Sequence, residues 1–223
     1  MDTNKFSTEE IAAVYKAIRE RRDMRHFLAT PLEESQLERL VQAAHMGPSV
    51  GLMQPWRFIR ITDLQLRTAI QEHVEEERIA TADALGERSR EFMRLKVEGI
   101  LSCAEVLVVG LTDNREKYIF GRRTMPEMDL ASASCAIQNM WLAARAEGIG
   151  LGWVSLFDPE KLRELCRMPE GSQPFAILCL GHVKDFYPAP MLEIEEWDKR
   201  KPISDIFYEN AWGTDQSGAK SVR

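Results

Sequence analysis

Four arginines crowd into one short stretch near the N-terminus: Arg19, Arg21, Arg22 and Arg25, with Asp23 between the last two. A guanidinium stays charged at physiological pH and binds phosphate oxygens in pairs, so the cluster could hold a phosphorylated ligand. The spacing alone is equally typical of a solvated, positively charged helix end. Asp23 could transfer a proton or only orient an arginine. We expect the neighbouring cations to lower the pKa of its carboxyl group, which favours a base.

Two further segments contain residues suited to ligand binding. The stretch 48–56 (PSVGLMQPW) is broken by proline and glycine into a loop, where Gly51 lets the backbone approach a ligand closely and Ser49 lies beside it. Ser155 ends a short predicted strand, and its hydroxyl can both donate and accept a hydrogen bond. On these residues alone, an ordinary turn glycine and a strand-end serine bonded to backbone are the better interpretations.

Composition limits the possible classes of protein. The 223 residues carry 29 basic and 35 acidic side chains, a net charge of -6, which argues against a general nucleic-acid binder. The N-terminus is polar, and no apolar run approaches the roughly 20 residues that span a bilayer. We therefore expect a cytoplasmic protein without membrane association. Its cysteines should be buried, reduced thiols: Cys103, Cys135, Cys166 and Cys179.

Helical patterns predict the elements that position these residues. The capping box at 7–10 (STEE) and the apolar spacing behind it predict a helix to about Arg21. A second helix is predicted from Thr30–Glu33, with Pro31 at its first position. The 129–147 helix carries small apolar residues nearly all round, which predicts burial on every side. The other predicted helices are 64–80, 87–98, 159–167 and a short pattern at 203–210.

Strand patterns complete the predicted fold. The run 105–112 (EVLVVGLT) is apolar throughout, which is typical of a central strand buried on both faces. Similar reasoning predicts strands at 57–62, 151–155 and 174–183. No internal repeat, linker or low-complexity segment interrupts the chain. The sequence therefore predicts one α+β domain, in which helices flank a mixed, mostly antiparallel central sheet.

Four motifs, in order along the chain, resemble signatures of the FMN-dependent nitroreductase-like family. The resemblance implies the nitroreductase-like fold, FMN as ligand and a homodimer. It also implies one domain over 1–223, whose C-terminal tail from about 184 extends over the partner subunit. The motifs are the family's RRSxRxF at 21–27, its PSxxNxQPW loop at 48–56, its GLG strand entry beside the flavin at 148–153 and its basic C-terminal segment at 199–202.

Departures from the ordinary flavin reductases favour one branch of that family. Asp23 replaces the usual serine, Leu52 replaces the usual asparagine, and the glycine-rich strand continues as Trp153–Phe157. With the YENAWG ending, these strings look like the 5,6-dimethylbenzimidazole synthases (BluB). The resemblance implies that reduced FMN and dioxygen become 5,6-dimethylbenzimidazole, the lower base of cobalamin, and erythrose 4-phosphate. FMN is then a substrate, which a separate flavin reductase supplies.

Two other functions stay open at this point: an FMN-dependent NAD(P)H nitroreductase or quinone reductase, and a non-catalytic flavin-binding or storage protein. The resemblance assigns catalysis to Asp23 and Ser155, and Gly51 could offer its amide to dioxygen. The stretch 80–95, which contains Arg88, is a candidate lid, although a solvated helix face explains Arg88 more simply. The four histidines lack metal-ligand spacing, so no metal is expected. The expected FMN contacts are Arg21, Arg22, Asp23, Met24, Arg25, Ser49, Gly51, Arg88, Ser155, Leu156 and Arg200.

Overall fold

The computed structural model describes residues 4–213, which form two compact units with the boundary between Pro188 and Ala189. The first unit contains the sheet and the large helices, and each unit is described by itself. The expected tail over a partner subunit spans both units from about 184, and its last residues, 214–223, lie outside the described part. The single-domain organisation therefore stays a prediction.

Four antiparallel strands form the central sheet of the first unit, in the order β1-β2-β4-β3. The central pair, β2 and β4, is buried on both faces as the continuous apolar runs predict. The expectation of an α+β fold with a mostly antiparallel sheet is confirmed, because all three ladders among residues 4–213 are antiparallel. The strands are β1 (Trp56–Arg60), β2 (Glu105–Leu111), β3 (Ile149–Val154) and β4 (Gln173–His182).

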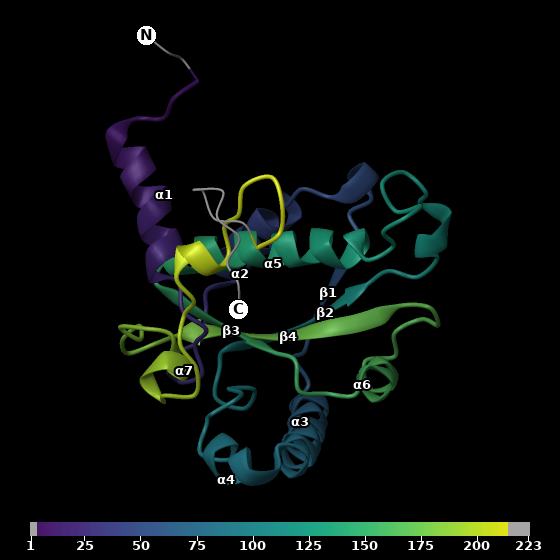
Figure 1. Ribbon diagram of the computed structural model, residues 1–223. Helices are drawn as coiled ribbons and strands as arrows, with labels where there is room; N and C mark the ends of the chain where they lie inside the picture. Colours follow the sequence, from purple (N-terminus) through teal and green to yellow (C-terminus); the bar gives the residue numbers. More distant parts are fainter. Residues whose placement is uncertain (1–3, 214–223) are drawn as a thin grey trace. The chain divides into compact units, whose positions relative to one another are not determined.

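Helices cover both faces of this sheet, with α2 and α5 on one face and α3 and α6 on the other (Figure 1). Alternate residues of each strand point to opposite faces. In β2, Leu107 and Val109 therefore join the core under α2 and α5, whereas Val106 and Val108 join the core against α3. The helices of this unit are α1 (Thr8–Glu20), α2 (Glu34–His45), α3 (Leu64–Ala84), α4 (Ser89–Phe92), α5 (Met128–Ala146) and α6 (Pro159–Leu165).

The helix ends follow local capping chemistry. The capping box of α1 is confirmed, since the Ser7 hydroxyl accepts from the Glu10 amide at 3.2 Å and Glu10 accepts from the Ser7 amide at 2.8 Å. The predicted helix start around Pro31 is wrong. The second helix begins at Glu34, because Glu33 forms its own capping box with Gln36.

The predicted helix over 87–98 is also wrong. Only a 3₁₀ turn, η2 (Gly86–Arg88), and the single turn of α4 form there. Arg78 of α3 donates to the carbonyl oxygens of Met93 and Leu95 at 2.5 and 3.3 Å. The guanidinium of Arg78 thus binds carbonyl oxygens that would accept backbone hydrogen bonds if the helix continued.

The prediction that 129–147 is buried on every side is wrong as well. The buried residues of α5 follow one stripe at helical spacing, including Ala133, Ile137 and Met140. Cys135 lies on the opposite, exposed side, and Leu130 is partly exposed there. All four cysteines are free thiols, but only Cys103 and Cys179 are fully buried as expected.

The second unit contains short helical turns joined by irregular backbone. Its turns are α7 (Met191–Ile194) and the 3₁₀ turn η4 (Ile203–Asp205). The predicted short helix at 203–210 is limited to η4, and the Tyr208 hydroxyl donates to the Asp205 carbonyl oxygen at 2.6 Å just behind it.

Candidate functional site

The arginine-rich segment lies along the free edge of β3, as if it were a further strand. The Met24 amide donates to the Leu151 carbonyl oxygen at 3.0 Å, and Asp23 forms a parallel bridge with Leu151. The Trp153 amide donates to Asp23 Oδ1 at 2.8 Å. Two motifs that are about 130 residues apart are thereby joined through backbone and carboxylate.

Two glycines of β3 permit this close approach. A Cβ atom at Gly152 would lie 2.1 Å from the Met24 carbonyl oxygen and 3.0 Å from Arg25 Nη1. A Cβ atom at Gly150 would lie 3.3 Å from Met24 Cγ and 2.4 Å from Val183 Cγ1. The glycine spacing that we associated with a flavin site therefore has a direct role, because it lets the arginine segment dock on the strand.

Asp23 is held at both carboxylate oxygens. Arg25 donates from Nη2 to Asp23 Oδ2 at 2.5 Å and to the Trp153 carbonyl oxygen at 2.7 Å. Arg25 is 7% exposed, whereas 41% of the Asp23 side chain remains accessible. The pair therefore combines a buried, fixed cation with a carboxylate that a ligand can reach.

The expectation of a lowered pKa at Asp23 is wrong. Burial raises the pKa of its carboxyl group above the ordinary value and outweighs Arg25, the Trp153 amide and Arg21, which all lower it. The exposed part of the side chain moderates this effect. A raised pKa lies nearer to neutral pH, where a carboxyl group can both take up and release a proton.

The remaining arginines of the motif surround this pair. The guanidinium of Arg21 lies 4.4 Å from the centre of a Trp141 ring, a cation–π contact. Arg22 donates to the carbonyl oxygens of Arg19 and Arg21 at 2.8 and 2.7 Å. The interpretation of Trp141 as a core residue is correct, since it is buried in α5, but it misses this contact with the motif.

Several guanidinium nitrogens at this site are buried without a hydrogen-bond partner among the described residues: Arg22 Nε, Arg25 Nε and Arg25 Nη1. Buried donors normally have acceptors, so these nitrogens mark a position where a ligand with oxygen or nitrogen acceptors would fit. An anionic, heteroaromatic molecule such as FMN has both kinds of acceptor. The donor set therefore fits the expected ligand.

The second expected catalytic residue lies close by in the chain. Ser155 directly follows β3, two residues after Trp153, and is exposed. Its hydroxyl makes no hydrogen bond within residues 4–213, so it is available to a ligand. Leu156 packs partly against the α3-side core, and Met24 is buried against β3 with 1% of its surface exposed.

The 48–56 loop is elsewhere in the first unit. Gly51 adopts a left-handed conformation with φ of 53°, and Ser49 accepts from the Gln54 amide at 3.1 Å. The Val50 amide donates to Ser132, nine residues before Trp141 on α5, which is roughly 13 Å along the helix. Ser49 and Gly51 therefore lie apart from Asp23 within the first unit.

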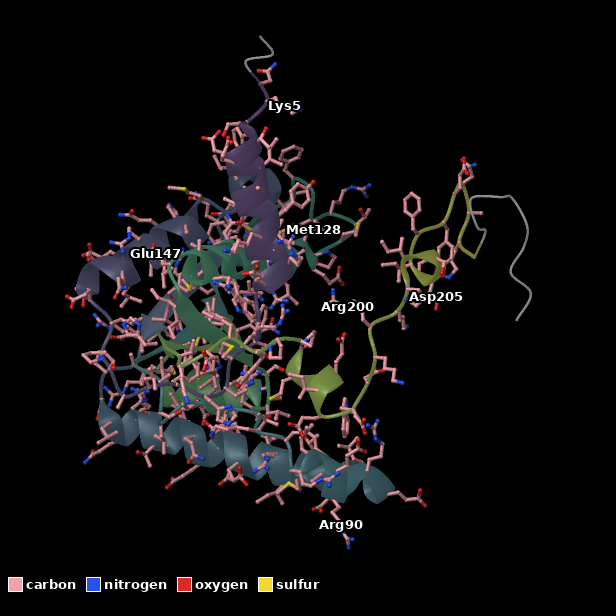
Figure 2. The ribbon with its side chains drawn as sticks, turned by 90° about the vertical axis from the view of Figure 1, so that its left-hand side faces the viewer. Lys5, Arg90, Met128, Glu147, Arg200 and Asp205 are labelled. Carbon is pink, nitrogen blue, oxygen red and sulfur yellow. The ribbon has the colours of Figure 1, made fainter. Side chains whose placement is uncertain are left out.

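Two expected arginines are engaged elsewhere. Arg88 forms an ion pair with Glu91 at 3.0 Å beyond the end of α3, and Phe92 and Leu95 are buried beside it. Figure 2 shows its neighbour Arg90, on α4, with a side chain that points outward. Arg200 belongs to the second unit, where it pairs with Glu193 at 3.5 Å. Their expected contacts with FMN and the lid over 80–95 stay predictions.

Other features of the described chain lie apart from this site. Two shallow clefts are lined by α2 and β1, including Val41 and Phe58, and β1 is at the opposite edge of the sheet from β3. None of the helices among residues 4–213 has the length and hydropathy to cross a membrane. The same residues contain no group of three metal-ligating side chains.

Comparison with known proteins shows the family to which this chain belongs. The family model described as the nitroreductase family matches residues 18–182, and the chain belongs to that family. Within it, the chain is 38% identical to the 5,6-dimethylbenzimidazole synthase of Rhodospirillum rubrum, over 82% of this chain and 87% of that protein. It is 34% identical to the 5,6-dimethylbenzimidazole synthase of Rhodobacter capsulatus, over 85% of this chain and 93% of that one. The synthases and the nitroreductase family are both named for enzymes, and this chain is an oxidoreductase-type enzyme.

Solved structures agree with the fold. A BluB-like flavoprotein from Clostridium difficile superposes with a TM-score of 0.69 at 16% identity, covering 89% of this chain and 99% of that chain. An iodotyrosine deiodinase bound to FMN and 3-iodo-L-tyrosine gives a TM-score of 0.65 at 21% identity, covering 78% and 92%. At these identities the likeness concerns the fold alone.

Proposed function

We propose that this enzyme is a 5,6-dimethylbenzimidazole synthase, which fragments reduced FMN with dioxygen into 5,6-dimethylbenzimidazole and erythrose 4-phosphate. One observation carries the proposal: a reachable carboxylate, Asp23, is fixed against β3 by Arg25 and the Trp153 amide, beside buried guanidinium donors without partners. The identity to synthases of that name over most of the chain supports it.

Each residue of the site has a distinct task in this proposal. Reduced FMN, when bound, supplies the electrons for dioxygen and the atoms of the product. Arg21, Arg22 and Arg25 bind and orient its anionic and polar groups. Asp23 takes up and releases a proton at Oδ1 or Oδ2, which its raised pKa favours. Ser155 donates or accepts a hydrogen bond at the polar edge of the ring system.

The surroundings of the enzyme follow from the same proposal. A separate flavin reductase supplies the reduced FMN, because a substrate that is consumed must be delivered continuously. Its free cysteines fit a reducing compartment, and we propose that it acts in the cytoplasm. Ser49 and Gly51 reach the flavin of a partner subunit in a homodimer, since their own chain holds them away from Asp23.

The fate of the flavin tests this function. The protein is incubated in air with an excess of chemically reduced FMN, and the products are followed by mass spectrometry. We expect 5,6-dimethylbenzimidazole and erythrose 4-phosphate in equal amounts, with loss of FMN. An anaerobic sample is the matched control and should keep its FMN. Recovery of oxidised FMN without any benzimidazole contradicts the proposal.

The same assay separates the alternatives. More distant relatives include a protein named NADH dehydrogenase in Thermus thermophilus, which is 27% identical. A reductase of nitro compounds or quinones would oxidise NAD(P)H over many turnovers and leave FMN intact. A flavin-storage protein would retain oxidised FMN and turn over neither substrate.

A further inference from the structure

The segment behind β4 holds the arginine-rich segment on its outer side. We define the 186–188 strap as Phe186, Tyr187 and Pro188, which follow β4 and belong to the first unit. We propose that Tyr187 is a positioning residue, whose hydroxyl fixes the backbone of Arg25 and thereby the carboxylate of Asp23. This inference deepens the proposed function and rests on it for its catalytic consequence.

The Arg25 amide points away from the sheet. Successive amides of an extended segment point to opposite sides. The Met24 amide points to β3 and bonds with Leu151, so the Arg25 amide points away from the sheet. No further strand of the described chain lies there, and the Tyr187 hydroxyl accepts from the Arg25 amide at 3.2 Å. Tyr187 thus takes the place of the missing strand.

The Tyr187 side chain is itself held in place by neighbouring residues. Its hydroxyl lies 2.6 Å from His26 Nδ1, and the two rings meet edge to face. The next residue, Pro188, accepts from Arg22 Nη2 at 3.1 Å. The preceding Phe186 ring lies 4.2 Å from the guanidinium of Arg145 on α5. Three consecutive residues therefore contact the motif and the helix that packs behind it.

Arg25 connects the Tyr187 contact to the carboxylate of Asp23. Arg25 donates its backbone amide to the Tyr187 hydroxyl and its guanidinium to Asp23 Oδ2. A shift of the Arg25 backbone would move the guanidinium and leave Asp23 misplaced, and small misplacements of a reacting group lower the rate strongly. Tyr187 acts through Arg25 and does not need to touch the flavin.

Replacement of one hydroxyl tests the inference. In Tyr187→Phe, we expect hydrogen exchange of the Arg25 amide, resolved by NMR, to be roughly tenfold faster, as for the loss of one hydrogen bond. We expect product formation at saturating reduced FMN to fall on the order of tenfold, with a smaller change in affinity for oxidised FMN. Thr68→Val, which removes a hydroxyl on α3 that donates to the Leu64 carbonyl oxygen at 2.9 Å, is the matched control and should change neither.

A second variant separates the two bonds of the hydroxyl. His26→Ala removes the histidine contact but keeps the Arg25 bond, so Arg25 exchange should change less than in Tyr187→Phe. The inference is overturned if the Arg25 amide of Tyr187→Phe exchanges at the wild-type rate, or if that variant forms product at an unchanged rate. If the wild-type protein forms no benzimidazole, the proposed function fails, whereas the exchange measurement still tests the contact.

Discussion

Asp23 combines access to a ligand with two fixed hydrogen bonds, and this combination determines how it should respond to pH. Its raised pKa means that the carboxylate is lost as the pH falls through a value above the ordinary one of about 3.9. A base must be ionised, so the rate of product formation should fall on the acidic side with a midpoint above that of an ordinary aspartate. A pH–rate profile with reduced FMN measures it.

Substitution of the same residue supplies the matching test. Asp23→Asn should lower product formation by about 10²–10⁴-fold, the usual contribution of an acid–base group. FMN binding should persist, because the asparagine oxygen can still accept from the Trp153 amide. Asp63→Asn is the control, since asparagine caps α3 as well as aspartate does. Wild-type product formation by Asp23→Asn would remove the proposed base.

The cysteines provide a second prediction at the residue scale. Burial raises the pKa of the Cys166 thiol to about 11. At pH 8 its thiolate fraction should be on the order of 0.1%, so iodoacetamide should modify exposed Cys135 long before Cys166. Modification of Cys166 should accelerate steadily up to pH 10. Peptide mass spectrometry over a pH series measures both sites, and equal rates at pH 8 would contradict the expectation.

The sequence predicts the residues of this site but not their interactions. The motif at 21–25 predicted a binding cluster with an acid inside it. It could not predict the direction of the pKa shift at Asp23, because the burial that raises it comes from β3, about 130 residues away. Tyr187 was missed for a similar reason. An aromatic residue in a tail predicts a buried ring, but its hydrogen bond to Arg25 depends on the packing.

At the scale of elements, the docking of the arginine segment on β3 depends on Gly152. Gly152→Ala places a methyl group against the Met24 backbone, which cannot move as a side-chain end can, and should destabilise the fold by about 1–3 kcal/mol or more. Gly110→Ala is the control, because its nearest neighbour is the flexible end of Met168. Thermal melts measure both, and an equal effect would show that the backbone contact is unimportant.

A second element depends on a buried ion cluster. Asp129, at the start of α5, is 4% exposed and accepts from Arg115 and Arg122, each at 2.9 Å. Asp129→Asn leaves two largely buried cations without their anion, which should cost about 3–5 kcal/mol of unfolding free energy. Glu160→Gln, which removes an exposed partner of Arg163, should cost less than about 1 kcal/mol. Urea titrations compare them; similar losses would refute the assignment.

Elements were predicted well where the pattern is local and poorly where distant contacts decide. The strands begin and end within two residues of the predicted bounds, because their apolar runs are themselves the cause of burial. The 87–98 helix failed because Arg78, on another helix, takes the carbonyl groups that would continue it. Periodicity describes the residues of one element and contains no information about such donors.

The whole molecule has an apolar surface that one chain does not bury. Helix α1 has no buried residue, although Val14, Tyr15 and Ile18 form an apolar side on it. Phe120, beside Gly51, is 84% exposed as well. Apolar surface of this extent usually marks an interface.

In the proposed homodimer the partner subunit completes the site, so association should be linked to catalysis. We expect a mass twice the 25.5 kDa of one chain by light scattering at micromolar concentration. Ile18→Glu places a charge in the apolar side of α1 and should shift the protein toward the monomer. Product formation should fall with the dimer fraction, because in the proposed homodimer Ser49 and Gly51 reach the flavin of the partner subunit. Leu64→Glu, on the opposite layer, is the control. A fully active monomer would show that one chain suffices and that the 48–56 loop has no part in the site.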